Sequence, residues 1–281
     1  MKISYKPIIL FIVFFGCWFK LNTNQTIAGF NKTDLEQLLS ITHLTYDGTV
    51  DDLVKVTQKS WRRPNDKERW EIQEIFENKR QELLPIFTRM GLVNALTVAR
   101  SSYDHILFIG AIIPNMQKRI VMFKNMFEGI LYKDIVVLSG ARDLTLSEQE
   151  QVERLGWKPT PVTEAQVIPF LFAQEGFEME KVMLIDVPKI EKSPGVWARP
   201  TSEDTLEKWL MTKPTVGSIL IISSQPFCCS QKIVVESLVS KDFSVDIVGT
   251  KAPESTKIAV YLDTIARSLY QWHNTQIKNK K

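Results

Sequence analysis

The chain has 281 residues, of which 35 are Lys or Arg and 32 are Asp or Glu, and 44% of its residues are hydrophobic. This hydrophobic share argues against disorder, and the length suits one large domain or one domain with an extension. The formal net charge of +3 equals the charge of Lys2, Lys6 and Lys20, and residues 1–28 contain no acidic side chain. The rest of the chain is therefore neutral, which argues against a general nucleic-acid binder, because such proteins present a basic surface to phosphates.

Residues 1–28 are typical of an export signal. Lys2 and Lys6 precede an apolar run from Ile8 to Phe19. Such a run suits the core of a signal peptide and is shorter than the roughly 20 residues of a membrane span. Thr26-Ile27-Ala28 offers a cleavage site, and without cleavage the segment could anchor the chain with its basic end inside. We expect an exported chain of the cell envelope, periplasmic or secreted, that meets the membrane through this segment.

Two alternatives stay open for the same segment. Phe15-Gly16-Cys17 is similar to a lipoprotein cleavage box, although Phe stands where smaller residues are usual. A buried N-terminal strand or helix is the other alternative. The continuity of the apolar run favours the export signal over both.

The cysteines and histidines predict neither a disulfide framework nor a metal site. Cys228 and Cys229 are adjacent, and neighbouring cysteines rarely reach disulfide geometry. No Cys/His pair has the spacing of a zinc site. No histidine lies close to the cysteine pair in sequence, so a buried pair is favoured over a catalytic nucleophile.

Residues 29–102 are predicted to form a helical N-terminal extension. Asn31 to Asp34 can cap a first helix that carries several leucines. Residues 66–84 have apolar side chains at helical spacing, and we expect Pro85 to break or kink that helix. Trp61 and Trp70 are expected to be packing residues.

Residues 103–273 show a different pattern, in which short apolar runs alternate with amphipathic stretches. Predicted strands occupy 105–109, 134–138, 181–185, 218–222 and 243–248. Predicted helices occupy 114–128, 147–155, 164–174, 203–211, 227–239 and 257–272. Apolar strands each followed by a helix indicate a parallel sheet covered on both faces. The predicted fold is therefore α/β, a Rossmann-like doubly wound parallel sheet of about five strands, and residues 274–281 form a basic tail.

In such a sheet, ligands bind beyond the carboxyl ends of the strands. The residues that follow the predicted strands there are Gly110, Ser139, Gly140, Arg142, Asp186, Ser223 and Ser224. Small residues allow a close backbone approach, and arginines could offset the charge of a phosphate. No GxGxxG or Walker sequence follows the first strand, so no cofactor is assigned.

Several short segments coincide with these strand ends. They are Phe108 to Ala111 with the helical Arg119, Val136 to Gly140, Thr163-Glu164-Ala165, and Ser202 to Lys208. Together they resemble the ElyC/SanA/YdcF family over about residues 103–270. Lys208 replaces an asparagine of the family's pattern, and Phe227 and Ser230 stand where the family has a histidine and an arginine. These departures put in doubt any contact or chemistry that depends on those side chains.

The resemblance implies a Rossmann-like fold, often with an N-terminal membrane segment, and a role in envelope biogenesis. It adds Glu164, Ser202, Thr205 and Glu207 to the candidate ligand-binding residues. The candidate catalytic residues are Glu164, Asp186 and Glu207.

Each candidate also has a structural interpretation. Ser202 or Thr205 could cap the following helix, with Glu207 as the capping-box partner, and Glu164 also begins a helix. Asp186 could simply end a strand in a turn, and Arg119 and Arg142 could be solvated charges.

Two functions remain open from the sequence. The first is an extracytoplasmic domain that binds or processes a phosphorylated, nucleotide-like or sugar-linked molecule at the strand ends. Its site would comprise Gly110, Arg119, Ser139, Gly140, Arg142, Glu164, Ser202, Thr205, Glu207, Ser223 and Ser224. The second is a non-catalytic envelope assembly factor that uses the sheet as a scaffold and residues 30–100 as a partner surface.

Overall fold

The computed structural model describes residues 26–64 and 71–278. The predicted export signal therefore lies almost entirely outside the described residues, as does Trp70. Within them, no helix is both long and apolar enough to cross a membrane.

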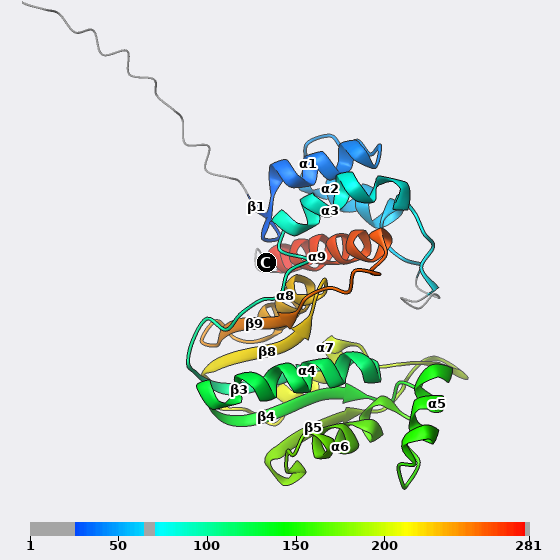
Figure 1. The fold of residues 1–281 in the computed structure, drawn as a ribbon. Coiled ribbons are helices and arrows are strands. Elements are labelled where there is room, and N and C mark those ends of the chain that lie inside the picture. Colours follow the sequence, from blue (N-terminus) through cyan, green and yellow to red (C-terminus); the bar gives the residue numbers. More distant parts are fainter. Residues whose placement is uncertain (1–25, 65–70, 279–281) are drawn as a thin grey trace, which may run out of the picture.

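A five-stranded parallel sheet forms the centre of the molecule (Figure 1). Its strands are β3 (Ser102–Ile109), β4 (Leu131–Gly140), β5 (Val182–Val187), β8 (Ser218–Ser224) and β9 (Ser244–Thr250), in the order β5-β4-β3-β8-β9. All four pairings are parallel. The predicted α/β fold with a doubly wound parallel sheet is confirmed.

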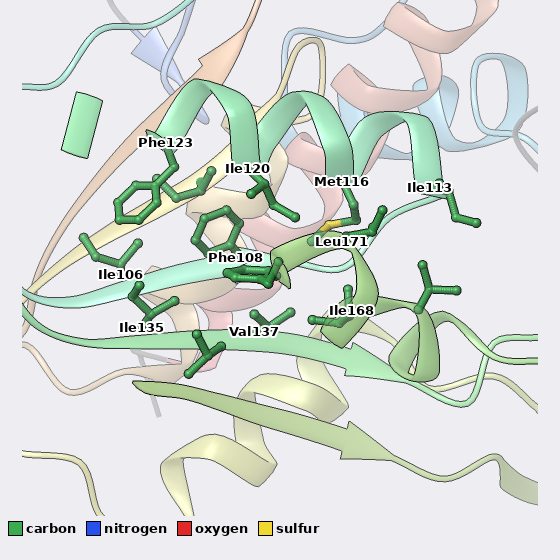
Figure 2. Close-up of a cluster of buried hydrophobic side chains, with 14 of the residues drawn as sticks. Ile106, Phe108, Ile113, Met116, Ile120, Phe123, Ile135, Val137, Ile168 and Leu171 are labelled. Atoms are coloured by element: carbon green, nitrogen blue, oxygen red, sulfur yellow. The ribbon is translucent and has the colours of Figure 1, made fainter. Parts of the chain in front are cut away.

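Alternate side chains of the strands enter two separate cores, as the two-residue period of a strand requires. Ile106 and Phe108 of β3 pack with α4 (Ile113–Met126) and α6 (Glu164–Gln174) on one face (Figure 2). Leu107 and Ile109 belong to the opposite core, with Trp209 of α7 (Ser202–Leu210) and Val235 of α8 (Cys228–Leu238). Burial on both faces explains the continuous apolar runs in the sequence.

The strand order places a topological switch between β3 and β8. From β3 the chain moves outward to β4 and then, past α5 (Leu146–Leu155) and α6, to β5. It returns through α7 to β8 on the other side of β3 and continues through α8 to β9. Connections that leave in opposite directions open a crevice at the carboxyl ends of β3 and β8.

The helical extension packs on the last helix of the chain. Its helices α1 (Lys32–Ile41), α2 (Val50–Ser60) and α3 (Arg80–Arg89) share a third core with α9 (Ile258–Lys278) (Figure 1). The ring of Phe87 stacks on that of Tyr261 with centroids 4.7 Å apart. Trp61 is 1% exposed within this core, as expected for a packing residue.

The predicted helix over 66–84 is wrong in its bounds. A short 3-10 turn, η2 (Glu77–Lys79), precedes α3, which begins at Arg80 and continues past Pro85. Phe76 has a left-handed backbone with φ of 58°, which no α-helix can include. Pro85 does not end α3, because Leu83, Ile86 and Phe87 on either side of it are buried in the core.

Several short elements were not predicted. They are the strand pairs β1 (Thr26–Ile27) with β2 (Phe30–Asn31) and β6 (Ile190–Ser193) with β7 (Val196–Ala198), and the turns η3 (Phe127–Gly129) and η4 (Met179–Lys181).

Candidate functional site

A cavity of about 870 Å³ lies at the carboxyl end of the sheet, where the strand order switches. Nine predicted site residues line it: Gly110, Arg119, Ser139, Gly140, Arg142, Glu164, Ser202, Thr205 and Ser224. Three others do not. Asp186 and Glu207 are exposed outside the lining, and Ser223 is buried, with its hydroxyl donating to Gln231 Oε1.

Arg119 joins the two strands at the switch. Its Nε donates to Ser224 Oγ of β8 at 3.0 Å, and its Nη1 donates to the carbonyl of Ile109 at the end of β3. The residue is 1% exposed, which rules out a solvated charge on α4. Burial lowers the pKa of Arg119 to about 10, which leaves the guanidinium charged at neutral pH.

Arg142 lies between two carboxylates. Its Nη1 and Nη2 donate to Glu148 at 2.8 and 2.9 Å, and its Nε donates to Glu164 Oε2 at 2.7 Å. Ser139 Oγ donates to the other oxygen of Glu164 at 3.1 Å. Arg142 is also buried, so this charge is not solvated either.

The two glutamates respond differently to burial. Burial alone would raise the pKa of Glu148, but hydrogen bonds from Arg142 and Thr145 hold that pKa below its usual range. Burial prevails at Glu164 and raises its pKa, against the opposing effects of Arg142 and Ser139. Glu164 is thus the cavity carboxyl whose protonation is made easier by its surroundings.

Two glycines permit these close approaches. A Cβ atom on Gly110 would lie 2.0 Å from Glu164 Oε1 and 2.9 Å from the carbonyl of Leu138. A Cβ atom on Gly140 would lie 2.2 Å from Pro200 Cγ. The small residues at the strand ends therefore bring neighbouring groups of the protein close to the strands.

The helix caps differ from the structural interpretation drawn from the sequence. Thr201 caps α7 in a capping box with Asp204, so neither Ser202 nor Thr205 is the cap and Glu207 is not its partner. Thr163 caps α6 with Gln166 as the partner, which leaves the carboxylate of Glu164 directed to Ser139 and Arg142. The Thr205 hydroxyl donates to the carbonyl of Ser202 at 3.1 Å.

One wall of the cavity was not predicted from the sequence. Gln58 of α2, together with Arg62 and Arg63 just after it, faces this space, as do Arg267, Tyr270 and Gln271 of α9. The local signal for this wall in the sequence is the adjacent pair Arg62-Arg63, in a segment that the sequence predicts as a loop or the entry to a helix. Its position against α9, 200 residues further along, has no local signature.

The cavity lining is strongly basic. Among the described residues it contains Arg62, Arg63, Lys118, Arg119, Arg142, Arg199, Lys251, Lys257 and Arg267, against Glu164 and Glu203. Several of these cations have carboxylate partners, such as Glu148 for Arg142, Asp263 for Arg267 and Glu74 for Lys257. The lining still has a large formal excess of basic over acidic residues, whereas the chain outside residues 1–28 is formally neutral.

Metal and thiol chemistry find little support at the described residues. No group of three or more His, Cys, Asp or Glu side chains there could hold a metal ion. Burial raises the pKa of Cys228 to about 11 and that of Cys229 to about 12, so both are protonated and poorly nucleophilic at neutral pH.

In comparisons with known proteins, no family model and no curated protein matches this chain.

Proposed function

We propose that the chain is an exported, divergent member of the ElyC/SanA/YdcF family, and that its cavity binds a phosphorylated, nucleotide-like or sugar-linked molecule in cell-envelope biogenesis. The observation that carries this proposal is Arg119, a buried cation in the cavity lining at the switch between β3 and β8.

The environment of Arg119 favours an anionic ligand. Within the described part of the chain Arg119 makes no salt bridge, and its two hydrogen bonds go to the neutral groups Ser224 and Ile109. The charge of Glu164 acts on it from beyond salt-bridge distance and offsets only part of the cost of burial. Burying a cation costs free energy that an opposite charge offsets. A phosphate in the cavity would supply that charge, and its oxygens match the forked donors of a guanidinium.

A hydroxyl-bearing ligand is supported by Gln225. This residue lines the cavity and is 1% exposed, and its Nε2 donates to the carbonyl of Gly91 at 2.7 Å. Its Oε1 is a buried acceptor that has no hydrogen-bond partner among the described residues. A sugar or ribose hydroxyl is a donor that would satisfy this acceptor.

If the cavity also carries out a reaction, Glu164 is the group best suited to proton transfer. Burial raises its pKa above the usual range of a glutamate, and the bonds from Ser139 and Arg142 hold its carboxyl group in one orientation. Asp186 and Glu207, the other two catalytic candidates, lie outside the cavity lining.

A ligand panel tests the proposal. Thermal unfolding of the full chain is measured with nucleotides, adenosyl compounds, sugar nucleotides and lipid phosphates. Binding raises the unfolding temperature saturably. We expect at least one phosphorylated compound to do so, and Arg119→Lys to weaken it. Lys124→Gln on the same helix, which is not in the cavity lining, is the matched control and should leave binding unchanged.

Two results would count against the proposal: no stabilisation by any member of the panel, or equal binding to wild type and Arg119→Lys. Export is tested separately. The mass of the full-length product made in a secreting host should fall by the mass of the leader, or the uncleaved chain should stay with the membrane fraction. An uncleaved chain in the soluble cytoplasmic fraction would contradict export.

A non-catalytic assembly factor is the second candidate. Phe227 and Ser230 line the cavity where the resembled family has a histidine and an arginine, and the Ser230 hydroxyl donates to the carbonyl of Phe227 at 2.9 Å. This candidate predicts no small-molecule binding and a protein partner instead.

A further inference from the structure

We propose that the cavity takes a ligand with two separated anionic groups. One group is bound at the strand ends by Arg119. The other is bound at the helical wall, which we define as Arg62 and Arg63 after α2 and Lys257 and Arg267 near and on α9. The inference rests on the proposed function, because it names the class of anionic molecule that the same cavity accepts.

The part of the helical wall that follows α2 is held against α9 by hydrogen bonds. Gln58 Nε2 donates to the carbonyl of Ala266 at 2.6 Å, and the backbone N–H of Arg63 donates to Asp263 Oδ1 at 2.9 Å. The Arg62 guanidinium lies 5.9 Å from the centroid of the Tyr270 ring, which also lines the cavity. The extension is therefore a built part of the cavity, and it presents arginines there in a fixed arrangement.

This side of the cavity is basic throughout. The described lining residues from α2, from the segment that follows it, from the loop after β9 and from α9 include Arg62, Arg63, Lys251, Lys257 and Arg267 but no carboxylate. Asp263, which accepts from Arg267 Nε at 2.9 Å, is 2% exposed and does not line the cavity. A second anionic group of the ligand would lie among guanidinium and ammonium groups without meeting a carboxylate.

The two basic regions belong to different layers of the molecule. Arg119 belongs to α4, which covers one face of the sheet, whereas the helical wall belongs to the layer of α2 and α9 beyond α8 (Figure 1). Helix α8 contacts both β8 and α9, and its Ser230 and Gln231 line the cavity. A ligand that reaches from one region to the other would pass these neutral polar side chains, which suits a polar spacer such as a sugar.

The size of the cavity agrees with such a ligand. Its 870 Å³ lies near the upper end of the roughly 300–1,000 Å³ that pockets for drug-sized ligands occupy. A single phosphate bound at Arg119 would fill only a small part of this volume.

Alkanediol phosphates provide a direct test. Calorimetric titration of the full chain compares the bisphosphates of butanediol, hexanediol and octanediol, each against its own monophosphate. We expect the best-fitting bisphosphate to bind at least about tenfold more tightly than its monophosphate, the ratio that one further charged contact provides. Inorganic tripolyphosphate serves as the probe for charges that are adjacent to one another.

Substitutions in the cavity lining test which residues bind each of the two anionic groups of the ligand. Arg62→Gln should remove most of the preference for the bisphosphate while leaving monophosphate affinity within about twofold. Lys59→Gln, an exposed lysine of α2 outside the cavity lining, is the matched control. Lys257→Gln is a second variant of the helical wall in case Arg62→Gln unfolds. Arg119→Lys should weaken the monophosphate and the bisphosphate alike.

The outcomes separate this inference from the proposed function. If every monophosphate binds as tightly as its bisphosphate, the two-ended ligand is wrong while an anion site remains. The same conclusion follows if tripolyphosphate binds most tightly and its affinity is unchanged in Arg62→Gln and Lys257→Gln. If no compound of either kind binds to the wild type, both proposals fail together.

Discussion

Arg119 Nε donates to Ser224 Oγ at 3.0 Å, and this bond joins α4 to the carboxyl end of β8 inside the cavity. The same guanidinium also binds the carbonyl at the end of β3. Helix α4 leaves from β3, so one side chain connects both strands that flank the topological switch. The residue that joins the two strands is therefore also the buried cation on which the proposed anion site depends.

Removing the Ser224 hydroxyl should destabilise the fold. Ser224→Ala leaves the Nε of a buried guanidinium without its acceptor, which costs about 1–3 kcal/mol of the free energy of unfolding. Ser230→Ala is the control. The carbonyl that the Ser230 hydroxyl binds also accepts from the backbone N–H of Gln231, so we expect a change within about 0.5 kcal/mol. Urea unfolding measures both, and equal costs would contradict the role given to Ser224.

A methyl group at Gly110 should disturb Glu164. The Cβ of Gly110→Ala would lie 2.0 Å from Glu164 Oε1 and 2.9 Å from a backbone carbonyl, so Glu164 must leave its position beside Ser139. We expect ligand-induced stabilisation to be lost and the unfolding temperature to fall. Gly129→Ala, where no atom lies within 4 Å of the added Cβ, should change neither. Unimpaired binding by Gly110→Ala would show that the placement of Glu164 does not matter to the ligand.

His105 should make stability depend on pH. Its Nδ1 lies 2.9 Å from Asp134 Oδ1 and its Nε2 lies 2.7 Å from the carbonyl of Thr215, so both ring nitrogens face acceptors. Burial alone would lower the pKa of His105, but the bonds to Asp134 and Thr215 and the charges of Asp134 and Asp104 raise it above 6.5. The rings of Trp209 and Phe243 pack on the imidazole.

The sign of this dependence follows from the raised pKa. The contribution of His105 to stability is complete below the unfolded pKa of about 6.5 and is lost as pH rises through the higher folded pKa. The free energy of unfolding, measured by urea at a series of pH values, should therefore decrease over this range. Asp134→Asn should flatten the decrease. A wild type that becomes more stable as pH rises through the range would contradict the interaction.

The stability that the cap of α7 provides should depend on Thr201 and not on Ser202. Thr201 Oγ1 accepts from the backbone N–H of Asp204, so Thr201→Ala should cost about 1 kcal/mol of stability. Ser202→Ala should change stability by no more than about 0.5 kcal/mol, because Ser202 is not the cap. Chemical denaturation distinguishes the two variants, and a larger loss for Ser202→Ala would restore the cap expected from the sequence.

Most of the fold could be predicted from local patterns in the sequence. Helix α6 begins and ends where it was predicted, because Thr163 caps it and the apolar residues that follow are buried in one core. Ser139, Gly140 and Ser224 could be placed at the cavity because strand ends in a parallel sheet meet at one edge. The helix predicted from 66 was wrong because periodicity does not reveal a left-handed residue such as Phe76.

The candidate site was less accessible to sequence reasoning. Glu207 lies on the exposed side of α7, whose buried positions are Thr205, Leu206 and Trp209, so its place on the helix directs it away from the cavity. Asp186 is exposed on the edge strand β5. The basic wall of Arg62 and Arg267 joins segments about 200 residues apart, and only the packing of the extension on α9 brings them together.

The central claim is that a phosphorylated ligand binds at the switch between β3 and β8. NMR spectra of the arginine side-chain Nε–H groups test it most directly, with the Arg119 and Arg142 signals assigned by Arg119→Lys and Arg142→Lys. A phosphorylated compound that stabilises the protein should shift both signals saturably and leave the signal of Arg89, which pairs with Asp34 outside the cavity lining, unchanged. Saturable binding that leaves the Arg119 and Arg142 signals in place would contradict the account.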